Sequence, residues 1–247
     1  MSSGKNSERR QSRRVARQQA AQKAAKRKKQ VTVFGVAGVA ILLAAALILV
    51  PRLGGGGTSA ITIAPDPTAN TSLAHDGQTL GDPNAPVKVV EWANYQCPFC
   101  NQFWQTSETT FINDYIKTGK VHFEYNDLTF QWQESVDASE AATCAMDQGK
   151  FWQYHDTLFK NQKAENSGGF SRARLKKMAS DMGLDMSKFN DCFDGHKTAD
   201  QVKASDQKAQ QQNINATPTF FVNGKQVQNY TGWGSVKAAI DAALAGQ

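Results

Sequence analysis

The chain has 247 residues and a formal net charge of +6, but this charge is unevenly spread. Residues 1–52 contain 12 of the 28 Lys and Arg side chains and a single acid, Glu8, which leaves 16 basic and 21 acidic side chains elsewhere. The larger part of the chain is therefore mildly acidic. It lacks the basic surface that is typical of nucleic-acid-binding proteins, so we expect no nucleic-acid partner.

Residues 1–30 form a basic tail, followed by Val31–Val50, which is twenty residues without a charge. As a helix this segment spans about 30 Å, the thickness of a bilayer core. The basic residues before it predict that the tail stays in the cytoplasm and that the rest of the chain lies outside. A cleaved signal peptide is the alternative, but residues 47–52 offer a poor cleavage site. We therefore predict a single-pass cell-membrane protein anchored by residues 31–50.

Residues 51–78 are rich in Gly, Pro, Thr, Ser and Ala, with four consecutive glycines at 54–57. This composition predicts a flexible linker between the membrane and a folded domain. The remaining residues, 79–247, are enough for one compact domain.

Strand patterns frame a long helical block within residues 79–247. The expected strands are Val87–Ala93, Val121–Tyr125, Thr219–Val222 and, after an Asn-Gly turn, Gln226–Gln228. Patterns between about 131 and 213 are helical, and a last helix is expected from Ser235 to Leu244. The order β–α–β, helical block, β–β–α predicts an α/β protein, with a thioredoxin-like core and a helical insertion at about 131–213.

The segment Cys97-Pro98-Phe99-Cys100 lies where the first strand pattern changes to a helical one. A helix N-terminus lowers a thiol pKa through its free N–H groups and its dipole, and the thiolate is the reactive form. Pro98 fits the first helical position, where its missing N–H costs nothing. We expect Cys97 to be the exposed, attacking thiol. Cys100, one turn further on the apolar face, is expected to be the sheltered resolving thiol.

A CxxC segment also occurs in zinc sites, which need two further ligands. The sequence has no second CxxC, and its four histidines are scattered singly at His75, His122, His155 and His196. His155 lies on a hydrophobic helical stripe, so we interpret it as a packed core residue. We therefore expect neither a metal nor another cofactor.

Four cysteines allow three pairings, and disulfides persist outside the cytoplasm. The pairing of Cys97 with Cys100 and of Cys144 with Cys192 is the one consistent with a redox CxxC pair. Because nothing around Cys144 or Cys192 suggests activation, we interpret this second pair as a structural disulfide. The alternative is two free, buried thiols.

Over roughly residues 79–247 the chain resembles the DsbA-like thiol–disulfide oxidoreductases, specifically their membrane-anchored bacterial members. Residues 81–87 are similar to the segment that leads into the family's first core strand, and residues 95–100 to its active site. Thr217-Pro218 resembles its cis-proline loop. The family's helical domain lies between the third strand and that loop, as the helical block does here.

This resemblance implies roles for individual residues. Cys97 would be the nucleophile and Cys100 the resolving thiol. Pro98 and Phe99 would form the active-site dipeptide, in which some well-known members carry His where this chain has Phe99.

The resemblance also implies a substrate-binding loop and a buried acid. Pro218 would be cis and face the redox pair, with Thr217 offering backbone hydrogen bonds to a substrate chain. Glu91, six residues before Cys97, matches the family's buried acid beside the active site. An acid among apolar strand residues has a raised pKa, which suits proton exchange with Cys100.

These observations predict an extracytoplasmic thiol–disulfide oxidoreductase. Its function is expected to be that of a dithiol oxidase that introduces disulfides into unfolded or reduced secreted proteins. By the resemblance, a membrane partner of the DsbB or vitamin K epoxide reductase type would reoxidise it. A disulfide reductase or isomerase on the same fold is one alternative, and a membrane-anchored metal-binding module is another. The second alternative would usually need a cluster of Cys, His and Met ligands, whereas the methionines after residue 140 lie on helical stripes.

Overall fold

The computed structural model describes residues 60–69, 73 and 75–246. The basic tail and the predicted anchor, Val31–Val50, lie outside these residues. Within the described residues, no helix combines the length and the apolar character needed to cross a bilayer.

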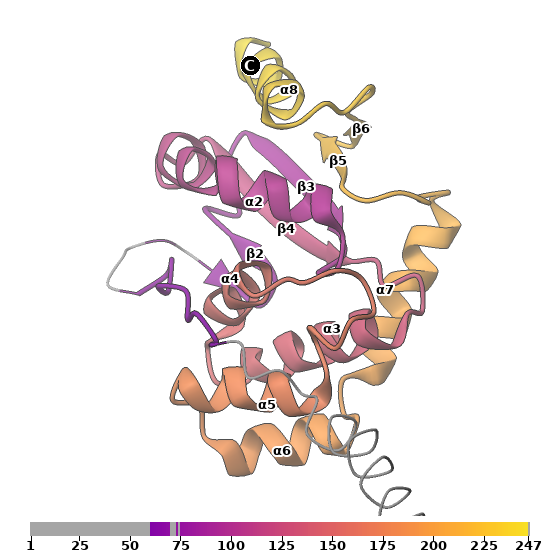
Figure 1. Cartoon of the computed structure of the whole chain (residues 1–247). Coiled ribbons are helices and arrows are strands. Elements are labelled where there is room, and N and C mark those ends of the chain that lie inside the picture. The colour runs from indigo at the N-terminus through magenta and orange to yellow at the C-terminus, as the bar shows by residue number, and fades with distance from the viewer. Residues whose placement is uncertain (1–59, 70–72, 74, 247) are drawn as a thin grey trace, which may run out of the picture. The chain divides into compact units, whose positions relative to one another are not determined.

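A six-stranded sheet in the order β1-β2-β4-β3-β5-β6 forms the centre of the domain (Figure 1). Its strands are β1 His75–Asp76, β2 Thr79–Leu80, β3 Val87–Ala93, β4 Val121–Asp127, β5 Thr219–Val222 and β6 Lys225–Gln226. Strands β3 and β4 are parallel, and the other neighbouring pairs are antiparallel. A parallel pair needs a crossover connection, and the helix α2 supplies it.

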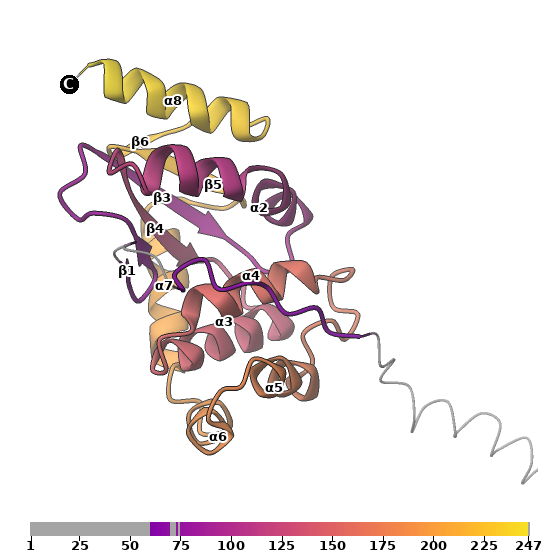
Figure 2. The same ribbon diagram turned by 90° about the vertical axis from the view of Figure 1, so that its left-hand side faces the viewer.

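The helices fall into two groups. Two of them, α2 Pro98–Phe111 and α8 Trp233–Ala245, lie near each other beside the sheet, and α2 continues into a π-helical turn, η1 Ile112–Ile116. Five more lie between β4 and β5 in the sequence, namely α3 Gln133–Met146, α4 Phe151–Lys160, α5 Arg172–Asp181, α6 Met186–Asp194 and α7 Ala199–Gln211. Helices α3, α5 and α6 stack away from the sheet, and α4 lies between them and α2 (Figure 2).

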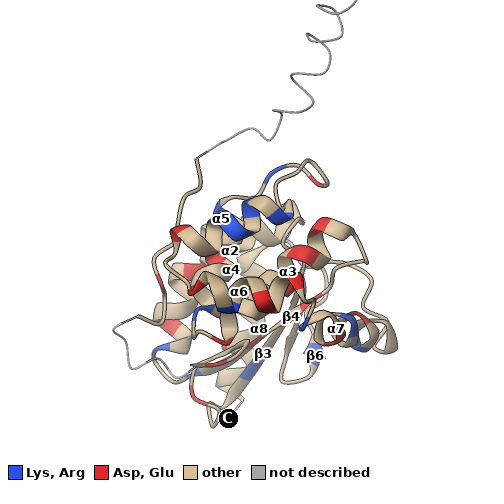
Figure 3. Ribbon diagram, turned by 90° about the horizontal axis from the view of Figure 1, so that it is seen from below, with Lys and Arg blue, Asp and Glu red and all other residues tan. Residues whose placement is uncertain are grey.

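Charges of both signs are interspersed over the helical block (Figure 3). Basic side chains of α5 pair with acids around them: Arg172 with Asp137 at 2.9 Å, and Lys177 with Asp181 at 2.9 Å. Ser171 is the N-cap residue of α5, but its side chain makes no capping hydrogen bond. Gly183, after the end of α5, has the positive φ of 77° that glycine adopts without strain.

The side chains of β3 point alternately into two hydrophobic cores, one on each face of the sheet. Val87, Val89 and Ala93 belong to the main core with α2 and α4, whereas Trp92 lies in a smaller cluster with Leu128, Ala209 and Ile214. Side chains of a strand point alternately to opposite faces. Glu91 therefore points to the same face as the first three residues, into the main core beneath α2.

The segment predicted as a linker, residues 51–78, is partly held against the domain. The Thr62 N–H donates to Asn161 Oδ1 at 2.9 Å, and Asn161 Nδ2 donates to the Thr62 carbonyl at 2.8 Å. The Ala64 N–H donates to Thr157 Oγ1 at 3.1 Å, and Ala64 is buried. Residues 60–69 thus lie along α4, and β1 and β2 add a hairpin to the edge of β4. The composition of this segment does not reveal these contacts, because its backbone N–H and C=O groups make them. Their partners are the side chains of Thr157, on α4, and Asn161, just after it.

Candidate active site

Helix α2 begins at the CxxC segment, as the sequence predicts. Cys97 is its N-cap with extended backbone angles, φ −72° and ψ 120°, and Pro98 is its first residue. The side chain of Phe99 is 63% exposed, whereas Cys100 is completely buried. Cys97 is half-buried, so one thiol of the pair reaches the surface and the other is inside.

The loop before β5 lies against Cys97. The Thr217–Pro218 peptide is cis, and Cys97 Sγ lies 3.3 Å from the carbonyl oxygen of Thr217. Pro218 is buried and Thr217 is half-buried. Cys97 and Cys100 are free thiols in this structure.

The two thiols differ in acidity. The pKa of Cys97 is lowered to about 6, mainly by a hydrogen bond from the Cys100 thiol. Burial is the second-largest effect and raises the pKa, whereas the Thr217 side chain and the backbone N–H groups of Cys100 and Phe99 lower it further. The pKa of Cys100 is raised well above its usual value, first by burial and then by its neighbour Cys97. The arrangement therefore places the negative charge of the reduced pair on Cys97.

Glu91 is a buried acid in the same core. Its side chain is fully buried, and neither carboxyl oxygen has a hydrogen-bond partner in the described part of the chain. Burial is the main reason that its pKa is raised well above the usual value. The indole N–H of Trp104 faces the carboxyl group without normal hydrogen-bond geometry, so it offsets only part of this effect. The site thus favours a protonated carboxyl group near Cys100.

Two polar side chains hold the active-site loop to the helical block, and the sequence analysis missed both. Gln162 Nε2, just after α4, donates to the carbonyl oxygens of Tyr95 at 2.7 Å and Cys97 at 3.0 Å. Gln96 Nε2 donates to Ser135 Oγ, on α3, at 2.8 Å. A lone glutamine after a helix carries no sequence signal for such a role.

Tyr230 is another residue near the thiols that the sequence pattern does not reveal. It is half-buried before α8, and its ring stacks on Phe220 of β5 with centroids 5.5 Å apart. Burial raises its pKa, and the charges of Glu91, Cys100 and Cys97 add to this effect. Tyr230 therefore lies at the edge of the active site, on the β5 side.

Cys144 and Cys192 form a disulfide that joins α3 to α6, with Cα atoms 5.8 Å apart. Both residues are buried. In the part of the chain that the structure describes, no three His, Cys, Asp or Glu side chains are grouped so that they could hold a metal ion.

Comparison with known proteins places the chain in a family. Residues 74–242 match the family model described as Thioredoxin. The chain is 30% identical over 171 residues to "Disulfide bond formation protein D" of Bacillus subtilis, a match that covers 68% of this chain and 77% of that protein. The chain belongs to the DsbA-like thioredoxin-fold family of protein disulfide oxidoreductases.

Other relatives match a similar share of the chain. The chain is 31% identical over 166 residues to "Na(+)/H(+) antiporter NhaA 1" of Salinispora arenicola, and the match spans 67% of this chain but only about a quarter (24%) of that protein. Oxidised BdbD from Bacillus subtilis is similar in structure with a TM-score of 0.63 and 28% identity, over 68% of this chain and 93% of that one. Wolbachia pipientis alpha-DsbA1 shares the fold, with a TM-score of 0.61 and 22% identity over 74% and 97% of the two chains.

Proposed function

We propose that this DsbA-like protein is an extracytoplasmic dithiol oxidase that introduces disulfides into secreted proteins. The observation that supports this direction is the unequal acidity of the two thiols. Contacts from the Cys100 thiol and the Thr217 side chain stabilise the Cys97 thiolate, which exists only in the reduced pair. Stabilising the reduced form makes the disulfide form a stronger oxidant.

The exposed position of Cys97 gives it the role of the attacked sulfur. A substrate thiolate attacks Cys97 Sγ of the Cys97–Cys100 disulfide, forming a mixed disulfide and releasing Cys100 as a thiolate. Glu91 gives this thiolate its proton, because burial raises the pKa of the Cys100 thiol well above its usual value, and the negative charge passes to the Glu91 carboxylate. A second substrate thiolate then attacks the substrate sulfur of the mixed disulfide. The substrate leaves with a disulfide, and two electrons remain on Cys97 and Cys100.

Thr217 and Pro218 are assigned to substrate binding. The carbonyl oxygen of Thr217 lies 3.3 Å from Cys97 Sγ, so a chain bonded to Cys97 would pass beside this backbone. An extended substrate chain can bind beside exposed backbone through main-chain hydrogen bonds, and such bonds depend little on the substrate's sequence. This suits a substrate class that consists of many unfolded or reduced proteins.

The reaction leaves the enzyme reduced, so it requires an electron acceptor. We assign this role to a membrane partner of the DsbB or vitamin K epoxide reductase type, as the family resemblance implies. An anchor at Val31–Val50 would keep the domain beside such a partner on the outer face of the cell membrane, with the N-terminus in the cytoplasm.

Trapping of mixed disulfides tests this function. In cells making the full chain, Cys100→Ala should accumulate mixed disulfides between Cys97 and secreted proteins, because nothing resolves them. Cys97→Ser is the matched control and should accumulate few. Equal trapping by both variants, or trapping of cytoplasmic proteins alone, would contradict the proposal.

A further inference from the structure

Residues 60–69, which we call the docked segment, are bound through their backbone to one face of α4. Three polar side chains spaced by four residues share that face, namely Gln153, Thr157 and Asn161. Gln153 Nε2 donates to the Ala64 carbonyl at 3.1 Å, and Thr157 Oγ1 accepts from the Ala64 N–H at 3.1 Å. Asn161, at the end of this row, binds both the N–H and the carbonyl of Thr62.

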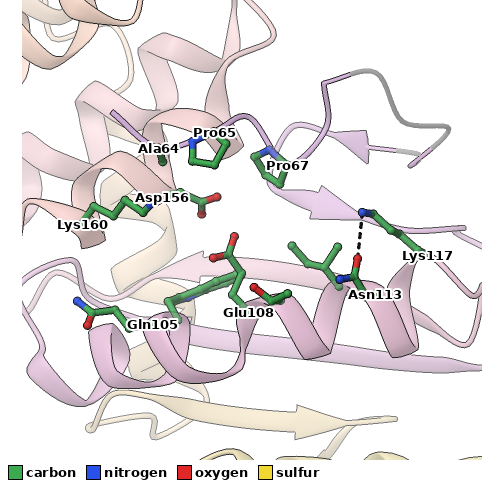
Figure 4. Close-up of a pocket in the computed structure, with 12 residues that line it drawn as sticks. Ala64, Pro65, Pro67, Gln105, Glu108, Asn113, Lys117, Asp156 and Lys160 are labelled. Atoms are coloured by element: carbon green, nitrogen blue, oxygen red, sulfur yellow. Dashed lines mark hydrogen bonds between the residues drawn. The ribbon is translucent and has the colours of Figure 1, made fainter. Parts of the chain in front are cut away.

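A cavity of about 580 Å³ separates residues 64–67 from α2. Figure 4 shows Pro65 and Pro67 on one side of this cavity and Glu108, from α2, on the other. In the same view the carboxyl group of Asp156, on α4, faces that of Glu108. Since the docked segment and α2 lie apart here, the end of α4 provides the connection between them.

Asn161 is the C-cap residue of α4, and its side chain is buried. Its Nδ2 donates to the Thr62 carbonyl at 2.8 Å and to the Thr157 carbonyl at 2.7 Å. Its Oδ1 accepts from the Thr62 N–H at 2.9 Å. Leaving a buried amide without a partner is costly, so the backbone of Thr62 holds this side chain in one orientation at the point where the chain leaves α4.

The next residue, Gln162, holds the start of the active-site helix. Its Nε2 donates to the carbonyl oxygen of Cys97 at 3.0 Å. The same carbonyl accepts the Asn101 N–H at 3.1 Å, which is the first hydrogen bond of α2. A single peptide bond therefore separates the residue that holds Thr62 from the residue that holds Cys97. Each step between Thr62 and Cys97 is a hydrogen bond or a covalent bond.

The placement of this first turn determines the acidity of the attacking thiol. The backbone N–H groups of Phe99 and Cys100 contribute to the lowered pKa of Cys97. N–H groups at the start of a helix stabilise a negative charge only where they point at it. A displaced first turn would therefore stabilise the Cys97 thiolate less.

We propose that the docked segment belongs to the active-site scaffold, with Thr62 and Asn161 as positioning residues for Cys97. The backbone of Thr62 orients Asn161, Asn161 fixes the end of α4, and Gln162 then holds the first turn of α2. The redox pair has its full reactivity only while this segment is bound. The inference rests on the proposed thiol–disulfide exchange at Cys97 and Cys100, but not on its net direction.

Replacing Thr62 by Pro tests this inference, because proline has no N–H to donate to Asn161. Thr62→Ala is the matched control, since the Thr62 side chain is exposed and the contact uses its backbone alone. Lys150→Met is a second control, because it removes the ion pair with Asp66 at the opposite end of α4. Asn161→Ala is a second test variant, whose folding is checked by circular dichroism.

The reduced full chain, purified in detergent, is alkylated with iodoacetamide between pH 4 and 9, and modification of Cys97 is followed by mass spectrometry. In Thr62→Pro and Asn161→Ala the midpoint of this profile should rise by about half a pH unit, which is about a threefold change in the ionisation constant of Cys97. The redox potential in a glutathione series should become less oxidising in both. Thr62→Ala and Lys150→Met should keep the midpoint and the potential of the unaltered protein.

A role in stability alone would lower the melting temperature and leave the Cys97 midpoint in place. An unchanged midpoint in both Thr62→Pro and Asn161→Ala would therefore overturn the positioning role while leaving the exchange reaction intact. Equal shifts in the test variants and the two controls would also overturn it. Failure of the unaltered protein to exchange with dithiothreitol would instead overturn the proposed function, and this inference with it, so the two failures are distinguishable.

Discussion

The side-chain amide of Gln162 lies 3.0 Å from the carbonyl oxygen of Cys97 and donates a hydrogen bond to it. Through this contact the helical block fixes the backbone of Cys97. The same amide nitrogen also binds the Tyr95 carbonyl, and Gln162 Oε1 accepts from Asn101 Nδ2 at 3.0 Å. One side chain thus connects three parts of the active-site segment.

Replacing Gln162 by Leu should loosen that segment. The variant loses three hydrogen bonds around partly buried groups, so the free energy of unfolding should fall by about 1–3 kcal/mol. Amide hydrogen exchange at residues 97–101 should become faster. Gln102→Leu, at an exposed position of α2, serves as the control and should change neither quantity. A Gln162→Leu protein with normal stability and normal exchange at these amides would refute this role.

The stability of the reduced protein should depend on pH through Cys97. Its folded pKa of about 6 lies below that of an unfolded thiol, about 8.5. Between these two values the unfolded chain binds one more proton than the folded one, so stability rises with pH across this range and is lost as pH falls toward 6. The oxidised protein has no such group.

Melting temperatures of the reduced and oxidised proteins at pH 5.5 to 8.5 measure this effect. As the pH increases, the melting temperature of the reduced form should rise relative to that of the oxidised form. Cys97→Ser has no oxidised form of the pair, and its melting temperature should lose the part of the rise with pH that comes from the Cys97 thiolate. A difference that is constant with pH in the unaltered protein would show that the Cys97 thiolate is not stabilised.

The Cys144–Cys192 disulfide should stabilise the helical block without taking part in the redox reaction. It joins residues separated by 48 positions, for which chain entropy predicts a stabilisation of about 4 kcal/mol. Cys144→Ala combined with Cys192→Ala should lower the melting temperature but leave the reaction at Cys97 largely unchanged. Loss of oxidase activity in a folded double variant would instead indicate that this pair carries electrons.

Full-length protein should fractionate with membranes, because residues 31–50 are predicted to be an uncleaved anchor. Protease added outside the cytoplasmic membrane should remove the domain or release it near the segment that precedes residue 60. A soluble mature protein that begins near residue 55 would contradict the anchor and support cleavage.

Local sequence patterns predict much of the active-site scaffold. Pro98 marks the start of α2, and the alternation of β3 places Glu91 on the core face. His155 is a buried core residue, as its hydrophobic stripe predicts. These features depend on neighbours along the chain, so periodicity and helix-start signals reveal them.

Other features depend on which side chains meet in three dimensions. Nothing near Gln162 indicates that it binds the Cys97 backbone, and the contact between Glu108 and Asp156 joins two separate helices. Strands β1 and β2 have two residues each, too few for a periodic pattern. The end of the chain differs only slightly from expectation, since β6 is Lys225–Gln226 and α8 begins at Trp233.

The redox potential of the Cys97–Cys100 pair tests the central claim most directly. Equilibration of the purified protein in a glutathione series, with each redox state trapped by alkylation, gives this potential. Stabilisation of the Cys97 thiolate predicts an oxidising value, closer to the roughly −120 mV of DsbA than to the roughly −270 mV of thioredoxin. A value near that of thioredoxin would contradict the oxidase assignment and identify the protein as a reductase.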